Sequence, residues 1–129
     1  RVTMDLGANV TLTGGVALQT QESWCEFISK DLQSISFGGN AAELYFEEDK
    51  FDDFLKKLAA IKGIFYVHPV QQYSWGQRVI RFYDPDFHIL EVGENMKSVC
   101  RRFLDSGMTI EAAAVRMNVP EKFVRACVR

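Results

Sequence analysis

Two glutamates stand on segments in which apolar and polar residues alternate. The segments are AELYFEE, QRVIRFYD and FHILEVGE. Successive side chains of a strand point to opposite faces, so the alternation predicts that Glu43, Tyr45, Arg81, Tyr83 and Glu91 share one face of a sheet. Two carboxylates, a guanidinium and two phenols on one face predict a polar site, because a purely structural sheet does not need them.

These residue types allow more than one chemistry. Carboxylate and amide oxygens suit a divalent ion with open coordination positions, and a carboxylate that leaves the metal can act as a general base. The planar fork of Arg81 can instead hold the carboxylate or phosphate of a substrate. The structural alternative is that Glu43 and Glu91 are strand carboxylates paired with Arg81 or Arg78.

Three ring side chains close to these strands can also reach a ligand. Trp75, at the start of a strand, can form a wall of the cavity or simply pack. His68 precedes Pro69 near a strand end, and His88 falls on the face opposite Glu91 if the pleat is regular. Both histidines are expected as surface or core residues more often than as ligand contacts.

The elements that position these residues lie between residues 42 and 94, in the order strand, helix and three strands. Asp49 is the expected N-cap of the helix, and Gly63 ends it. The apolar residues at helical spacing are Phe51, Phe54, Leu55, Leu58 and Ile61. The side chains expected on the helix-covered face of the sheet are Leu44, Phe46, Ile80, Phe82, Leu90 and Val92.

Residues 1–20 alternate in the same way and predict three short strands with turns between them. An irregular, partly helical stretch follows from Gln21 to about Gln33. Because the chain opens inside a strand, we expect a first strand and helix to precede Arg1. The expected fold class is therefore α+β, with tandem βαβββ modules over residues 1–96 that lack the first strand and helix.

The stretch WGQRVIRFYDPDFHILEVGE, residues 75–94, resembles the last hairpin of the vicinal oxygen chelate superfamily, which includes glyoxalase I, bleomycin resistance proteins and extradiol dioxygenases. In that superfamily a strand leads to a D-P-D-G turn, an apolar pair and a glutamate. Here Asp84-Pro85-Asp86, Ile89-Leu90 and Glu91 fill those places. AELYFEEDKFDDFLKKL looks like the strand and helix that open the second module. The resemblance covers about residues 1–96 and implies a curved mixed sheet around a cavity.

Phe87 stands at the turn position where members of that superfamily usually have glycine. A residue with a Cβ atom held at positive φ costs roughly 1 kcal/mol or more. We therefore expect a turn type with negative φ at Phe87, and anchoring of its ring by packing is the alternative.

The resemblance implies one divalent metal ion, Zn, Ni, Mn or Fe, held by side chains from four strands. It puts Glu91 on the last ligand position, Glu43 on the first position of the second module and Gln19 on the third ligand position, and the fourth ligand would precede Arg1. Glu43 and Glu91 would then also be catalytic, with the metal as Lewis acid. The residues expected to contact the substrate are Arg81, Tyr45, Tyr83 and Trp75.

Residues 97–129 break the strand pattern and form the second expected domain, a helical extension. Three short amphipathic helices are separated by Gly107 and Pro120, with Thr109 as the cap of the middle one. GMTIEAAAVRMNVPEKFVRACV superficially resembles a helix-turn-helix, but helices of about two turns without a dimer element would bind DNA weakly. Nucleic acid is therefore not an expected partner, and packing against the body or a partner subunit is expected instead.

The charge of the chain is uneven. Residues 1–96 carry eight Lys/Arg and fourteen Asp/Glu, whereas residues 97–129 carry seven and three. A basic tail can meet an anionic partner, or tail and body can attract one another within a chain or a dimer. We expect the second.

Composition limits the class of protein. With 47% hydrophobic and 12% aromatic residues, 129 residues can bury a core, which excludes a disordered or fibrous protein. No apolar run approaches the ~20 residues needed to span a bilayer and no signal segment opens the chain, so we expect a cytoplasmic protein without membrane contact. Three cysteines without a C-x-x-C pair predict free, buried thiols.

The leading hypothesis is a metal-dependent enzyme of the lyase or isomerase type, a homodimer that chelates the vicinal oxygens of a small metabolite. The first alternative is a metal-free small-molecule binding or resistance protein of the same fold. The second alternative is a ligand-sensing regulator with a DNA-binding tail. Whether the chain is an enzyme stays open at this point.

Overall fold

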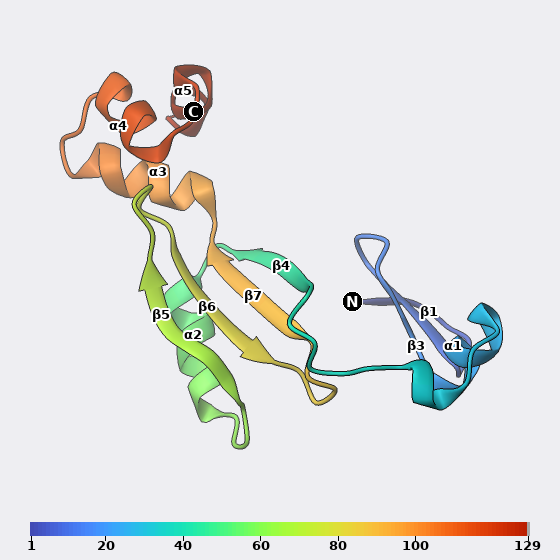
Figure 1. The fold of residues 1–129 in the computed structure, drawn as a ribbon. Helices are drawn as coiled ribbons and strands as arrows, with labels where there is room; N and C mark the ends of the chain where they lie inside the picture. Colours follow the sequence, from blue (N-terminus) through green and yellow to red (C-terminus); the bar gives the residue numbers. More distant parts are fainter. Residues whose placement is uncertain (129) are drawn as a thin grey trace. The chain divides into compact units, whose positions relative to one another are not determined.

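The computed structural model describes residues 1–128. The chain divides into two compact units, Arg1–Phe37 and Gly38–Arg129, each with its own sheet and helices (Figure 1). The α+β class is confirmed. Within residues 1–128 no helix is long and apolar enough to cross a membrane. The division into domains at residues 96 and 97 stays a prediction.

The first unit is an antiparallel sheet followed by helices. The strands pair in the order β1-β2-β3. Thr20 caps the first helix, because its side-chain oxygen accepts a hydrogen bond from the backbone N–H of Ser23. The three expected strands and the partly helical stretch are confirmed. The elements are β1 (Val2–Asp5), β2 (Asn9–Leu12), β3 (Ala17–Gln19), α1 (Gln21–Ile28) and the 3₁₀ helix η1 (Leu32–Ser34).

The second unit contains a complete βαβββ module. Its strands lie in the order β4-β7-β6-β5, with β4 parallel to β7 and the other pairs antiparallel. A parallel pair needs a long crossover, which α2 and the two intervening strands supply. The elements are β4 (Glu43–Glu48), α2 (Phe51–Ala60), β5 (Tyr66–Gln72), β6 (Arg78–Tyr83) and β7 (Ile89–Glu94).

One face of this four-stranded sheet packs against α2 (Figure 1). Leu90 and Phe54 are partly buried at the edge of the shared core. Complete burial of a side chain of this size contributes about 1.5–3 kcal/mol, and partial burial contributes less. The face predicted for the apolar residues of β6 and β7 is confirmed. The buried members of the core are Phe51, Leu58, Ile80, Phe82 and Val92.

Leu44 and Phe46 do not join this core, contrary to the prediction. Their exposed fractions are 40% and 48%. Both lie on β4, which is an edge strand of the sheet, whereas the core is built from α2, β6 and β7. Alternation along a strand determines which side chains share a face but not how far a helix extends over that face.

The start of α2 differs from the prediction. The N-cap position is Lys50 rather than Asp49, and no side chain caps the helix. The backbone N–H of Lys50 donates instead to the carboxylate of Glu48 at 2.8 Å. Asp52 and Asp53 lie in the first turn, where carboxylates interact favourably with the helix dipole. The helix is therefore supported at its N-terminus by charge rather than by a capping hydrogen bond.

Phe87 adopts a φ of 63°, so the prediction of a negative φ in the last turn is wrong. The carboxylate of Asp84 accepts hydrogen bonds at 2.9 Å from the backbone N–H groups of Asp86 and His88, which fixes the turn. The Phe87 ring contacts the rings of Phe65 and Tyr83, at centroid distances of 6.1 and 5.8 Å. Packing and side-chain hydrogen bonds offset the strain.

The tail forms three helices, as predicted, with Asn95 and Thr109 capping the first two. The three cysteines of the chain are free and buried, which is also as predicted. Burial and the neighbouring Cys127 raise the pKa of Cys100 to about 12, so this thiol stays protonated. The helices are α3 (Met96–Asp105), α4 (Ile110–Met117) and α5 (Glu121–Cys127). Their shared core is Val99, Cys100, Phe103, Ala113, Ala114, Met117, Val124 and Cys127.

Candidate functional site

Arg81 is the centre of a polar cluster on the face of the second sheet opposite α2. Its Nε donates to Glu43 Oε2 at 2.8 Å, and its Nη2 donates to Glu91 Oε2. Its Nη1 donates to the hydroxyl of Tyr73 at 2.6 Å and lies 3.2 Å from Nε2 of His68. The structure therefore brings together the three charged residues that alternation placed on one face.

Strand order and register explain why these side chains meet. Arg81 on β6 lies opposite Glu91 on β7 and opposite His68 on β5. Glu43 reaches the cluster from β4, which pairs with β7. The contact of His68 with Arg81 was not predicted, although the pairing of its strand with β6 is a signal that could have found it. Tyr73 lies beyond the end of β5, and alternation carries no information about its position.

The two glutamates have opposite electrostatic environments. Burial raises the pKa of Glu91, and the neighbouring Glu43 carboxylate raises it further. The hydrogen bond from Arg81 lowers the pKa of Glu43. The same bond raises the pKa of Arg81, which therefore stays charged. Two carboxylates whose pKa values move apart are suited to different protonation states at one pH, a pattern that is common at functional sites.

Tyr45 and Trp75, both predicted as substrate contacts, meet through Gln77. The Trp75 indole donates to Gln77 Oε1 at 3.1 Å, and Gln77 Nε2 donates to the Tyr45 hydroxyl at 2.9 Å. A Cβ atom on Gly93 would lie only 2.8 Å from Gln77 Nε2, so glycine makes room for this contact. The ring of Trp75 also stacks on that of Tyr73, with a centroid distance of 4.5 Å. The stack links this group to the Arg81 cluster.

Tyr83, the fourth predicted substrate contact, makes a different set of contacts. Its hydroxyl donates to Asn40 Oδ1 at 2.8 Å, and its ring contacts Phe87. Tyr83 lies two residues after Arg81 on β6, on the same face by the pleat. The structure thus places it beside the final turn, and a role for Tyr83 in binding stays a prediction.

The predicted metal ligands are Glu43, Glu91 and Gln19, and the first two already have partners in the structure. Both Glu43 and Glu91 already accept hydrogen bonds from the Arg81 guanidinium. Within residues 1–128 no group of three or more His, Cys, Asp or Glu side chains is arranged to hold a metal ion. Gln19 belongs to the first unit, so its place in a ligand set stays a prediction. The carboxylate oxygens of the second unit therefore fit ion pairs with Arg81 better than they fit two ligand positions of a metal site.

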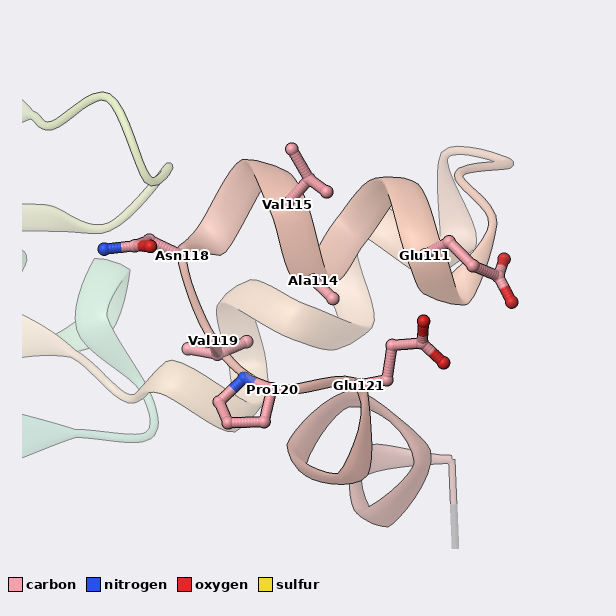
Figure 2. Close-up of a pocket in the computed structure, with 7 residues that line it drawn as sticks. All are labelled: Glu111, Ala114, Val115, Asn118, Val119, Pro120 and Glu121. Carbon is pink, nitrogen blue, oxygen red and sulfur yellow. The ribbon is translucent and has the colours of Figure 1, made fainter.

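A groove of about 620 Å³ lies between α4 and α5 in the tail (Figure 2). Glu111 and Glu121 stand in the first turns of these helices, with their carboxylates at the same end of the groove. Arg125 pairs with both of them, at 3.8 and 3.0 Å. Carboxylates at the helix N-termini oppose phosphate binding there. The regulator with a DNA-binding tail gains no support from this groove, and the absence of a nucleic-acid partner stays a prediction.

Comparison with solved structures supports the α+β fold. A protein of unknown function from Agrobacterium tumefaciens str. C58 is 35% identical over 74% of each chain, with a TM-score of 0.62. A glyoxalase-related enzyme from Fulvimarina pelagi is 16% identical over 74% of this chain and 70% of its own, with a TM-score of 0.58. A glyoxalase/bleomycin resistance protein/dioxygenase from Nocardioides is 19% identical over 72% of this chain and 65% of its own, with a TM-score of 0.54. The last two show the fold alone.

A comparison with curated proteins finds no match. The model of the glyoxalase-like domain family matches residues 1–97. This range includes strands β1 to β7 and the Arg81 cluster. The chain therefore belongs to the glyoxalase-like domain family, within the vicinal oxygen chelate superfamily that its last hairpin resembles.

Proposed function

We propose that the protein binds a small anionic metabolite on the face of the second sheet opposite α2, with no metal ion held between Glu43 and Glu91. The observation that carries the proposal is the position of Arg81, whose guanidinium pairs with both carboxylates. Membership of the glyoxalase-like family supports a small-molecule site in general terms. The proposal matches the metal-free alternative that the sequence left open.

The paired guanidinium competes with a metal ion for the same oxygens. At an effective dielectric constant of about 20, two unit charges about 4 Å apart interact by about 4 kcal/mol, and the repulsion doubles for a divalent ion. A metal bound by both Glu43 and Glu91 would therefore have to expel Arg81, which is also held by Tyr73. This competition favours a site in which Arg81, rather than a metal, faces the ligand.

The exposure of the two glutamates supports a route for an anion. The side chain of Glu43 is 37% exposed, whereas that of Glu91 is only 8% exposed. A ligand carboxylate or phosphate can therefore replace Glu43 on the guanidinium fork while Glu91 stays in place. Glu91, whose pKa is raised mainly by burial, would keep one side of the fork in place beside such a ligand.

A matched pair of arginine variants tests the proposal. Thermal unfolding is measured with inorganic phosphate, lactate and pyruvate for the wild type, Arg81→Lys and Arg101→Lys. Binding of an anion at 100 times its Kd stabilises the folded state by about 2.7 kcal/mol. Arg81→Lys keeps the charge but loses the fork, so most of this stabilisation should disappear, whereas the exposed Arg101 on α3 should be neutral. Equal stabilisation of all three proteins would contradict an Arg81 site.

The metal-dependent lyase or isomerase is the second candidate function. One observation favours it, namely that Glu43 and Glu91 come from paired strands and lie close enough for each to alter the pKa of the other. In such an enzyme the oxygens of Glu43, Glu91 and Gln19 would ligate a Zn, Ni, Mn or Fe ion. This activity, the metal and the oxygenated substrate stay predictions.

A further inference from the structure

The first tail helix holds the loop between β5 and β6 through two adjacent residues. Arg102 Nη2 donates to the backbone carbonyl of Gly76 at 2.8 Å and to Glu94 Oε2 at 2.9 Å. Glu94 is buried at the end of β7 and also pairs with Arg78 at 3.1 Å. Arg102 therefore ties α3 to the loop and to the end of the sheet at the same time.

Phe103, the next residue of α3, packs directly on the same loop. A Cβ atom added to Gly76 would lie 2.2 Å from Cζ of Phe103, and the φ of Gly76 is 90°. The Arg102 guanidinium lies 5.4 Å from the centroid of the Phe103 ring. The close approach of ring and backbone requires glycine at position 76, so loop and helix are complementary in shape as well as in charge.

The loop itself is closed by its own hydrogen bonds. The N–H of Gly76 donates to the carbonyl of Tyr73, and the N–H of Tyr73 donates to the carbonyl of Gln77, both at 2.9 Å. The side chain of Gln77 donates to the carbonyl of Glu94 at 3.0 Å. A displacement of Gly76 would therefore move Tyr73 and the stacked Trp75 with it.

Tyr73 is the point at which this loop meets the Arg81 cluster. Its hydroxyl accepts a hydrogen bond of 2.6 Å from Arg81 Nη1. The nitrogens of Arg81 that do not bind Tyr73 are the ones that pair with Glu43 and Glu91. The orientation of the fork toward the two carboxylates thus depends on where Tyr73 lies.

We infer that the C-terminal helices position the binding site. Arg102 and Phe103 are positioning residues that hold the loop at residues 73–77, and through Tyr73 this loop sets the orientation of Arg81. The functional meaning of the inference rests on the proposed function, but the coupling itself is a property of the protein without ligand. It gives the basic tail a role in the site that needs neither DNA nor a partner subunit.

Trp75 is a natural reporter of the loop. The chain has two tryptophans, so Trp24→Phe leaves Trp75 as the single tryptophan, which can be excited selectively at the long-wavelength edge of the absorption band. In this background we compare Arg102→Gln with Arg101→Gln, an exposed arginine on the same helix. Arg102→Gln should at least double the acrylamide quenching of Trp75 and shift the ¹⁵N resonance of Arg81 Nε, and Arg102→Lys should restore part of both signals. Arg101→Gln should leave them unchanged.

Two further variants separate positioning from general loss of stability. Phe103→Leu removes the ring from Gly76 but keeps the Arg102 ion pair. If Arg102→Gln fails to fold, this variant still tests whether α3 positions the loop. Val124→Ala weakens the buried tail core on α5 without touching the loop. The inference is overturned if Arg102→Gln and Phe103→Leu leave the Trp75 and Arg81 signals unchanged, or if Val124→Ala moves them equally. None of these measurements uses a ligand, so failure here is distinguishable from failure of the proposed anion site.

Discussion

At the scale of single residues, Arg81 organises the candidate site. Its position beside Glu43 and Glu91 could be predicted because the two-residue period of a strand is a local property of the chain. Its contact with Tyr73 could not be predicted in the same way, because Tyr73 lies in a loop held by a distant helix. Alternation therefore finds the ion pairs of the site and misses the Tyr73 side chain, which a loop presents.

Glu91→Gln should remove a pH-dependent loss of stability. Burial and the Glu43 carboxylate raise the pKa of Glu91, so the folded state holds this proton more tightly than the unfolded state. The contribution to stability is complete below the unfolded pKa and is lost as the pH rises through the folded pKa. Urea unfolding should therefore show that the wild type loses more free energy of unfolding than Glu91→Gln between about pH 4, near the unfolded pKa, and neutral pH.

The control for this experiment is Asp53→Asn, which changes an exposed carboxylate on α2. It should follow the wild type at both pH values. If the free energy of unfolding of Glu91→Gln falls as much as that of the wild type, the raised pKa of Glu91 is contradicted.

At the scale of elements, the helices and the order of strands in the second unit agree with the sequence, because helical spacing and alternation are both strong there. The wrong predictions concern how far α2 extends over the sheet and the conformation of the last turn. Leu44 and Phe46 have the right alternation but lie on an edge strand outside the core. Phe87 has a positive φ because Phe65 and Tyr83 anchor its ring, which no local pattern encodes.

Gly76→Ala should be much more destabilising than Gly107→Ala. Both glycines have a φ near 90°, so alanine costs roughly 1 kcal/mol of backbone strain at either position. At Gly76 the new Cβ also meets the Phe103 ring, which adds about 1–3 kcal/mol of overpacking, whereas nothing lies within 4 Å at Gly107. Chemical denaturation of the two variants gives the difference, and equal free energies of unfolding would contradict the packing of α3 on the loop.

Glu94→Gln should destabilise the joint between β7 and α3 by about 3 kcal/mol at neutral pH, because it leaves Arg78 and Arg102 without their shared buried carboxylate. Burial alone would raise the pKa of Glu94, but the two arginines lower it overall. Its contribution is therefore present above the unfolded pKa and lost as the pH falls through the folded pKa. Unfolding curves should show the cost of the variant shrinking toward acid pH, and a cost independent of pH would count against the ion pairs.

At the scale of the whole molecule, the uneven charge of the sequence corresponds to an ion pair between tail and body in the structure. Arg102 of the basic tail pairs with Glu94 of the acidic body within one chain, as expected for a tail attracted to its own body. The homodimer is a separate prediction. The sequence shows which residues are apolar but not which of them lie on an exposed surface. Leu44 and Phe46 on the edge strand β4 are more than one-third exposed, and the homodimer stays a prediction.

Sedimentation equilibrium tests the homodimer. The mass should be twice that of the 14.7 kDa chain, and Phe46→Asp should shift it toward the monomer because a carboxylate would be buried at the contact. Asp53→Asn, on the exposed side of α2, should leave the mass unchanged. A monomeric wild type at all concentrations would contradict the prediction.

Metal binding by the wild type and Arg81→Gln tests most directly whether Arg81, rather than a metal, occupies the two carboxylates. Each protein is dialysed to equilibrium against Zn, Ni, Mn or Fe(II), and its metal content is measured. We predict well under one equivalent on the wild type and more on Arg81→Gln, where the carboxylates of Glu43 and Glu91 are released. One equivalent on the wild type, unchanged in Arg81→Gln and lost in Glu91→Gln, would contradict the proposed site and support the metal-dependent enzyme.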